Sequence, residues 1–304
     1  MFRIFERIVS ASLIVWLAAT IAFIALQVLP GDAILSQLTQ SGATSEVIFA
    51  RRAALGLTDP IWLRYIRFLT QALQGDLGQS LLSGEPVTQA IARNLGPTLT
   101  LAGAALAVAS IAGVVLGVVG ALDFPIISAA ARIVVDIALS APIYWTGTLA
   151  IFLFTAQLGL LPSAGAGRLS QLILPVTVLG FHTSGAIARV AQANMRMVFE
   201  ADFIRTARAK GLHEYRVILR HGLRAGLPPV IGVIALQAGF LLSGTVITES
   251  LFVRPGIGRL LLDATAQQDY PIVQGVVIWS AMVYAGLGLA ADMLYRLLDP
   301  RVVL

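Results

Sequence analysis

Apolar residues along this chain gather in long blocks, separated by stretches in which charged and turn-forming residues collect. A helix that crosses a bilayer needs about 20 mostly apolar residues. Six blocks of that kind are found, at about residues 8–29, 99–122, 133–161, 172–190, 227–247 and 272–294. The pattern therefore predicts an all-α integral membrane protein with six transmembrane helices.

The first block follows Arg3, Glu6 and Arg7 and ends near Pro30. A secretory signal has an apolar region of only about 7–15 residues followed by a small-residue cleavage site. This block is longer and ends in Pro-Gly-Asp instead. We therefore expect a retained spanning helix and not a cleaved signal.

Residues 30–97 are of mixed polarity and are expected to form an extracytoplasmic insertion between the first two spans. Within it, residues 61–73 have an amphipathic pattern. The aromatic and basic residues of this piece are Trp62, Arg64, Tyr65, Arg67 and Phe68. Such a mixture fits a helix that lies in the membrane interface. Ordinary packing inside a small extracytoplasmic subdomain is the alternative.

Composition agrees with a membrane protein. Hydrophobic residues make up 57% of the 304, charged residues 12%, and the mean hydropathy is +0.84. A soluble domain has about 25% charged residues, so this chain has too little polar surface to cover a soluble particle. The absence of cysteine excludes disulfides, thiolate metal sites and cysteine nucleophiles.

The net charge of +5 is concentrated in one stretch, residues 189–224, which has eight basic and three acidic residues. Basic loops between spans face the cytoplasm, so the excess charge indicates topology and not nucleic-acid binding. Six spans then place both termini in the cytoplasm. Residues 30–97, 161–171 and 248–271 are expected outside.

The chain has no motif for ATP hydrolysis or metal catalysis. A P-loop needs Gly-Lys followed by Ser or Thr, and the one lysine, Lys210, stands in Arg-Ala-Lys-Gly. His182, His213 and His221 lack metal-ligand spacing, and we expect His182 to hydrogen-bond to a neighbouring helix. No catalytic, cofactor-binding or metal-binding residue is predicted, so the chain is not expected to be an enzyme.

Acidic residues within spans are costly and usually face the interior or a water-filled path. Asp136 and Asp292 lie near predicted cytoplasmic ends, where solvation explains them. Glu249 lies at the outer end of the fifth block. It is a candidate for the substrate path, and bracing of the following loop is the alternative.

Residues 200–216 form the most distinctive cytoplasmic segment. Glu200 and Asp202 suit a helix start, where the helix dipole favours negative charge, and Gly211 permits a sharp exit. A short amphipathic helix of this kind could dock in a groove of another protein. A solvated loop that only marks the cytoplasmic side is the alternative. In the second block, Gly113 and Gly117 predict close helix packing.

The segment from Arg205 to Gly211 resembles the cytoplasmic loop of permease subunits of binding-protein-dependent ABC importers, in the form typical of the dipeptide, oligopeptide and nickel group. Other motifs of that group follow in order along the chain. They are Leu29-Pro30-Gly31-Asp32, Gly75-Asp76-Leu77-Gly78-Gln79-Ser80, Leu158-Gly159-Leu160-Leu161-Pro162, Glu249-Ser250-Leu251-Phe252, Pro255-Gly256-Ile257-Gly258, Asp269-Tyr270-Pro271 and Leu298-Asp299-Pro300-Arg301.

The resemblance implies a type I importer permease fold over residues 1–304, in a bacterial inner membrane. It implies two ATP-binding subunits, a second permease that is homologous or identical, and an extracytoplasmic solute-binding protein. Residues 200–216 would be the helix that docks on the ATPase. The residues expected to contribute are Ala201, Ile204, Arg205, Thr206, Ala207, Ala209, Gly211, Leu212 and Glu214. The cargo could be a dipeptide, an oligopeptide, nickel or a chelated metal.

Two other classes are weighed against this one. A secondary transporter or channel driven by an ion gradient would favour paired buried acids or broken helices near the middle of the membrane. An intramembrane enzyme would need a catalytic constellation that this chain lacks. Genes for an ATPase and a binding protein beside this one would favour the importer.

Overall fold

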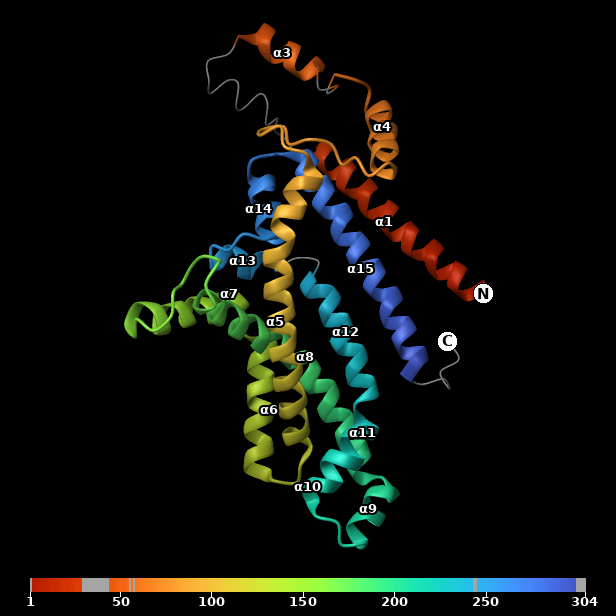
Figure 1. Ribbon diagram of the computed structural model, residues 1–304, viewed down its shortest axis with the longest axis vertical. Coiled ribbons are helices and arrows are strands. Elements are labelled where there is room, and N and C mark those ends of the chain that lie inside the picture. Colours follow the sequence, from red (N-terminus) through yellow and green to blue (C-terminus); the bar gives the residue numbers. More distant parts are fainter. Residues whose placement is uncertain (1, 29–43, 55, 57, 243–244, 299–304) are drawn as a thin grey trace.

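The computed structural model describes residues 2–28, 44–54, 56, 58–242 and 245–298, and the regular elements of that part are helices (Figure 1). In chain order they are α1 (Phe2–Val28), α3 (Ser45–Ala54), α4 (Ile61–Leu73), α5 (Val87–Ala121), α6 (Pro125–Ser140), α7 (Ile143–Ala150), the π-helix η1 (Ile151–Gln157), α8 (Ser170–Glu200), α9 (Asp202–Ala209), α10 (Glu214–Arg216), the π-helix η2 (Val217–Gly222), α11 (Leu223–Gly226), α12 (Pro228–Leu242), α13 (Val246–Leu251), α14 (Ile257–Ala266) and α15 (Tyr270–Leu298).

The described residues contain four helices that are long and apolar enough to cross a membrane, namely α1, α5, α8 and α15. Two bent pairs raise the number to six if each pair counts as one span. They join residues 125–140 to 143–157 and residues 214–226 to 228–242. The predicted class, an all-α membrane protein, is confirmed, and the predicted number of six spans is reached when each bent pair counts as one span.

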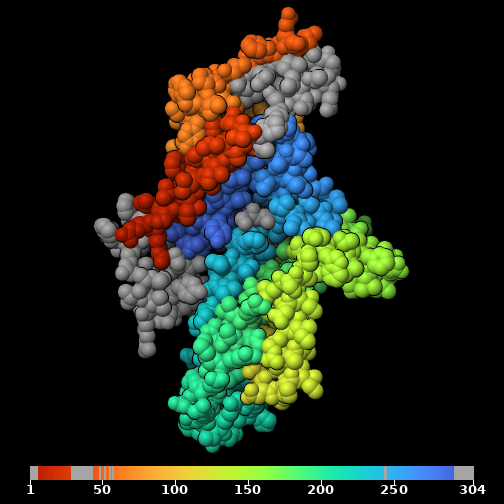
Figure 2. All heavy atoms as spheres, turned by 180° about the vertical axis from the view of Figure 1, so that it is seen from behind, coloured from red at the N-terminus to blue at the C-terminus, as the bar shows by residue number. Residues whose placement is uncertain are grey.

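The continuous span predicted at residues 133–161 is wrong, because the chain bends by 107° between α6 and α7. Pro142 stands at the bend and has no backbone N–H to continue the helix. His182 of α8 holds the two pieces together: its Nδ1 lies 2.9 Å from the carbonyl oxygen of Ala138, and its Nε2 lies 2.7 Å from Oγ1 of Thr146. The expected bonding of His182 to neighbouring helices is confirmed. Figure 2 shows residues 143–157 projecting from the body.

Other predicted boundaries also need correction. Helix α5 begins at Val87, inside the predicted insertion, and α6 begins at Pro125, between the second and third predicted blocks. Helix α8 continues to Glu200, so this residue ends α8 and does not begin the next helix. The predicted outer loop at 248–271 is largely helical in α13 and α14. These helix ends contain polar residues, so the apolar blocks alone did not predict the extensions.

Helices α5 and α8 pack closely through small residues. A Cβ atom added to Gly113 would lie 2.7 Å from Cβ of Ile187, and one added to Gly117 would lie 2.4 Å from Cβ of Ala191. Glycine is therefore required at both positions for the two backbones to approach. The predicted packing role of this glycine pair is confirmed, and it acts within one chain.

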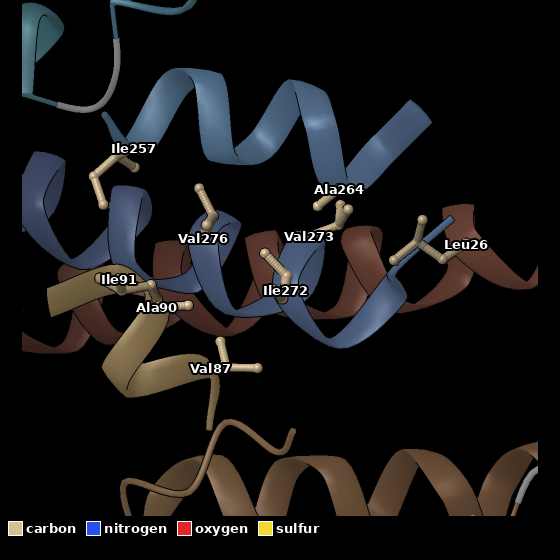
Figure 3. Packing of buried hydrophobic residues seen from close by; sticks show 9 residues of the cluster. All are labelled: Leu26, Val87, Ala90, Ile91, Ile257, Ala264, Ile272, Val273 and Val276. Carbon is tan, nitrogen blue, oxygen red and sulfur yellow. The ribbon is translucent and has the colours of Figure 1, made fainter. Parts of the chain in front are cut away.

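An apolar cluster joins α1, α5, α14 and α15 at one end of the molecule (Figure 3). Its buried members are Leu26, Val87, Ala90, Ile91, Ile257, Ala264, Ile272, Val273 and Val276. This core fixes α14 against the start of α15. It thereby positions the start of α14, on which the side chain of Glu249 packs, as described below.

Candidate functional site

The first candidate site, in the segment expected to face the cytoplasm, is built around α9, which has a well-defined start and stop. Ala201 is extended, with φ −70° and ψ 146°, and breaks the chain between α8 and α9. Asp202 in the first turn and Arg208 in the last turn both complement the helix dipole. Gly211 then adopts φ +73°, the left-handed conformation that favours glycine.

One face of α9 packs on its own chain. Ile204, Ala207 and Val217 are buried together, with Leu212 against them. Ile204 and Val217 have no exposed surface. These apolar residues therefore hold α9 in place and are not available to a partner protein.

An ion pair fixes the other end of α9. Nε and Nη2 of Arg208 donate to the two carboxylate oxygens of Glu214, at 3.1 and 2.6 Å. This bidentate contact lowers the pKa of Glu214 and raises the pKa of Arg208. Because the two residues lie on either side of Gly211, the pair closes the turn that follows α9.

The predicted docking residues thus fall into distinct groups. Arg205, Thr206 and Ala209 are exposed on the side opposite the buried face. Phe203 was not singled out from the sequence, yet it is 47% exposed on the flank of α9. A large apolar side chain left in water on a short helix is a typical anchor for a partner. Its apolar character within a charged segment is the signal that could have found it.

The second candidate site, called the outer site because it is expected to lie outside, is centred on Glu249, whose side chain has no exposed surface. Its carboxylate accepts hydrogen bonds from Oγ1 of Thr98 at 2.7 Å, Oγ1 of Thr245 at 3.0 Å and the backbone N–H of Arg259 at 3.0 Å. The hydroxyl of Thr98 also accepts from the N–H of Ile257 at 2.8 Å. The carboxylate therefore joins α5, α13 and the N-terminus of α14, where the helix dipole favours negative charge.

Two glycines of the Pro255–Gly258 motif make room for this arrangement. A Cβ atom at Gly256 would lie 2.2 Å from Cδ of Glu249. A Cβ atom at Gly258 would lie 2.6 Å from the backbone nitrogen of Val246. The spacing between Glu249 and the glycines thus reflects a carboxylate packed directly on the backbone at the start of α14.

Two further buried polar residues tie the outer segments together. Asp269 accepts from the hydroxyl of Ser80, 189 positions away along the chain, and from the N–H of Leu81 at 3.0 Å. Nη1 of Arg254 donates to the carbonyl oxygens of Gly165 and Gln171 at 3.0 and 3.2 Å. Separate sequence motifs are therefore parts of one hydrogen-bonded outer face.

Within the described residues, no group of three or more His, Asp or Glu side chains is placed to hold a metal ion. Asp136 is exposed and pairs with Arg189 at 2.9 Å, which agrees with the expected solvated position. The structure thus presents a helical membrane body, a short helix exposed at one end and a hydrogen-bonded face at the other. These features fit a transmembrane transport subunit.

The chain belongs to the family of binding-protein-dependent transport system inner membrane components, whose model matches residues 109–304. It is 38% identical over 288 residues to the glutathione transport system permease protein GsiC of Pectobacterium atrosepticum, covering 93% of this chain and 92% of that protein. It is 35% identical over 314 residues to a Brucella suis biovar 1 protein whose name describes a peptide transport system permease, covering 98% of each.

Solved structures support the fold. The MetNI methionine ABC transporter in an inward-facing conformation matches with a TM-score of 0.58 and 15% identity, covering 69% of this chain and 97% of that chain. An amino acid ABC transporter matches with a TM-score of 0.51 and 16% identity, covering 71% of this chain and 95% of that chain. The chain is therefore an ABC importer permease, and the ion-gradient alternative is set aside. The ATPase is a separate subunit, and a solute-binding protein is also implied.

Proposed function

We propose that this permease imports a peptide-like substrate and receives the force of ATP hydrolysis through α9. The observation that supports the second part is the division of α9 into two faces. Ile204 and Ala207 fasten it to its own chain, whereas Arg205, Thr206 and Ala209 are exposed. A helix packed on its own chain in this way moves with α8 when the ATPase displaces its exposed face.

The proposed ATPase contact is tested by paired substitutions on the two faces. Ala209→Asp should leave the permease folded but reduce co-purification of the ATPase and substrate-stimulated hydrolysis in proteoliposomes. Ala207→Asp places a charge in the buried cluster and should lower the yield of folded permease itself. Arg220→Ala, exposed but outside α9, is the control. Normal ATPase attachment and hydrolysis for Ala209→Asp would refute the docking role.

For the cargo, the names of the relatives point to peptides, because glutathione is itself a small peptide. The same motifs were also expected for nickel and chelated-metal importers, so these stay competitors. The test is uptake by the importer reconstituted with its own solute-binding protein. Uptake of glutathione or a dipeptide is expected. Uptake of a nickel chelate alone would overturn the peptide assignment.

We further propose that the permease works beside a second permease, homologous or identical, with both termini in the cytoplasm. The arginine-rich segment at residues 189–224 supports that orientation. Mass measurement of the importer extracted in lipid nanodiscs tests the pairing. A particle with one permease would contradict it.

For Glu249, we propose the bracing role over the path-lining role. Full burial and three hydrogen bonds support bracing, because a residue that lines a path needs exposed surface. Glu249→Gln should then impair folding and transport together. Lost transport in a fully stable Glu249→Gln variant would favour the substrate path instead.

A further inference from the structure

Helix α4 is held against the outer part of α1 by a small aromatic cluster. The ring of Phe23 lies 5.3 Å from that of Tyr65 and 5.5 Å from that of Phe68. The hydroxyls of Tyr65 and Thr20 are 2.8 Å apart. Figure 2 shows α4, in orange, next to α1, in red. One face of α4 is thus committed to its own chain.

The contact lies well below the end of α1. Thr20 precedes Val28, the last residue of α1, by two turns, which corresponds to roughly 12 Å along the axis. Leu69 and Leu73 line the same apolar groove as Trp16 of α1 and Met282 of α15. The second half of α4 therefore lies beside the membrane-crossing parts of α1 and α15, and not above them.

The adjoining edge of α4, which includes Leu73 at the rim of this groove, is apolar and uncovered. Trp62, Ile66 and Leu73 are 64%, 51% and 88% exposed. Their spacing of four and then seven residues places them along one side of the helix. An uncovered stripe of large apolar side chains at this depth points to contact with a nonpolar medium.

The charged residues of α4 do not interrupt this stripe. Nη1 of Arg64 donates to Oε1 of Gln27 at 3.0 Å, and Arg67 pairs with Asp59 at 2.9 Å. Gln71 faces a polar pocket between α4 and the start of α15. Helix α4 thus separates a polar side from an apolar edge.

The apolar edge of α4 continues an uncovered apolar surface of α1. On α1, a membrane-crossing helix, Ile21, Ile24 and Val28 are 65%, 54% and 77% exposed. We infer that the Trp62–Ile66–Leu73 edge of α4 is inserted among phospholipid acyl chains in the leaflet that surrounds this end of α1. Helix α4 is then a membrane anchor for the outer segment. It resolves the two alternatives left open by the sequence, because α4 both packs on its own chain and contacts lipid.

Spin labels can test this contact, since the chain has no native cysteine. Ile66→Cys and Leu73→Cys would be labelled in the importer in lipid nanodiscs. Collision of each label with oxygen, which partitions into lipid, is compared with collision with a water-soluble nickel chelate. We expect oxygen to dominate several-fold at both sites, as at the reference Ile24→Cys. The label at Gln71→Cys, on the polar side of the same helix, should instead collide mainly with the chelate.

Two results would overturn the inference. Labels at residues 66 and 73 that behave like the one at 71 would place the edge in water. Labels reached by neither reagent would mean that another protein covers it. A measurement without cysteine gives a check: lipids with brominated acyl chains should quench Trp62, and Trp62→Phe should remove that part of the quenching. None of these outcomes depends on whether α9 contacts the ATPase.

Discussion

Gly256→Ala is expected to destabilise the permease through a single clash with the carboxylate of Glu249. The added Cβ would lie 2.2 Å from Cδ and 2.3 Å from both oxygens of that carboxylate, whereas ordinary contact begins at 3.4 Å. Relief requires a shift of about 1 Å, and each of the three hydrogen bonds measures between 2.7 and 3.0 Å. A bond to a charged group contributes roughly 1.5–3 kcal/mol. Since part of the network can adjust, we expect a loss of about 2–4 kcal/mol.

Removal of the Glu249 carboxylate should suppress the cost of Gly256→Ala. Glu249→Ala should itself be strongly destabilising, because it leaves the hydroxyl of Thr98 and the N–H of Arg259 without the carboxylate. In that background the three atoms that would lie nearest to the added methyl group at residue 256 are absent. Gly256→Ala should then cost less than about 0.5 kcal/mol, which is the usual size of deviations from additivity between independent substitutions. A double-mutant cycle measures this difference directly.

Gly258→Ala is the matched control. Its Cβ would meet the backbone of Val246 at 2.6 Å and Oε2 of Glu249 only at 3.1 Å, so most of its cost should persist when Glu249 is absent. The assay is reversible unfolding of the purified permease in mixed micelles with increasing SDS. If the effects of Gly256→Ala and Glu249→Ala simply add, the carboxylate does not pack on Gly256, and the explanation of the motif fails.

Three further predictions concern the cytoplasmic end and the topology. Gly211→Val should cost roughly 1–2 kcal/mol of stability and weaken ATPase attachment, because the φ of +73° at this position excludes a β-branched residue. Gly211→Asn should retain most of the stability and most of the ATPase attachment. Equal behaviour of the two variants would contradict the backbone argument. Glu214→Gln should loosen the turn after α9 by about 0–1 kcal/mol. Because the folded-state pKa of Glu214 is lowered, its contribution should be present at neutral pH and disappear as the pH falls through that pKa, a dependence that the variant should lack in ATPase co-purification measured against pH. A membrane-impermeant thiol reagent applied to intact cells should label Thr44→Cys and spare His213→Cys, and the opposite labelling would reverse the topology.

The location of the membrane-crossing helices α1, α5, α8 and α15 could be predicted from the apolar blocks, because the bilayer sets their length. The 107° bend at Pro142 could not be read from block length, since the residues on both sides of it are equally apolar. The proline itself was the available signal. Part of the arrangement at the bend comes from His182, which is distant in sequence and contributes only once the helices have packed.

The cytoplasmic site shows a different limit. The sequence predicted a short helix ending at Gly211, and the helix and its left-handed glycine are present. Ala207 was expected to face the ATPase because of its small size. It is instead buried against its own chain, because Val217 follows the turn and supplies an apolar partner. Amphipathic spacing shows that a helix has an apolar face but not which protein covers it.

Two sequence motifs without an obvious role are explained by contacts across long separations. Glu249 and the glycines that follow it form one packed unit at the start of α14. Ser80 and Asp269 meet although 189 positions separate them. No local periodicity contains these pairings, so they could not be derived from one sequence.

The motifs at residues 29–32 and 298–301 lie wholly or partly outside the described residues, and their roles stay predictions. The outer and cytoplasmic sites themselves are connected through α5 and α8. Thr98 of α5 belongs to the Glu249 network, and α8 leads directly into α9. Between these points the two helices are packed backbone to backbone at Gly113 and Gly117, where not even one methyl group fits. Close-packed interfaces shift as units. Substitutions confined to the α9 surface or to the α14 start do not change the packing between α5 and α8, so the two sites can be tested separately in the same importer.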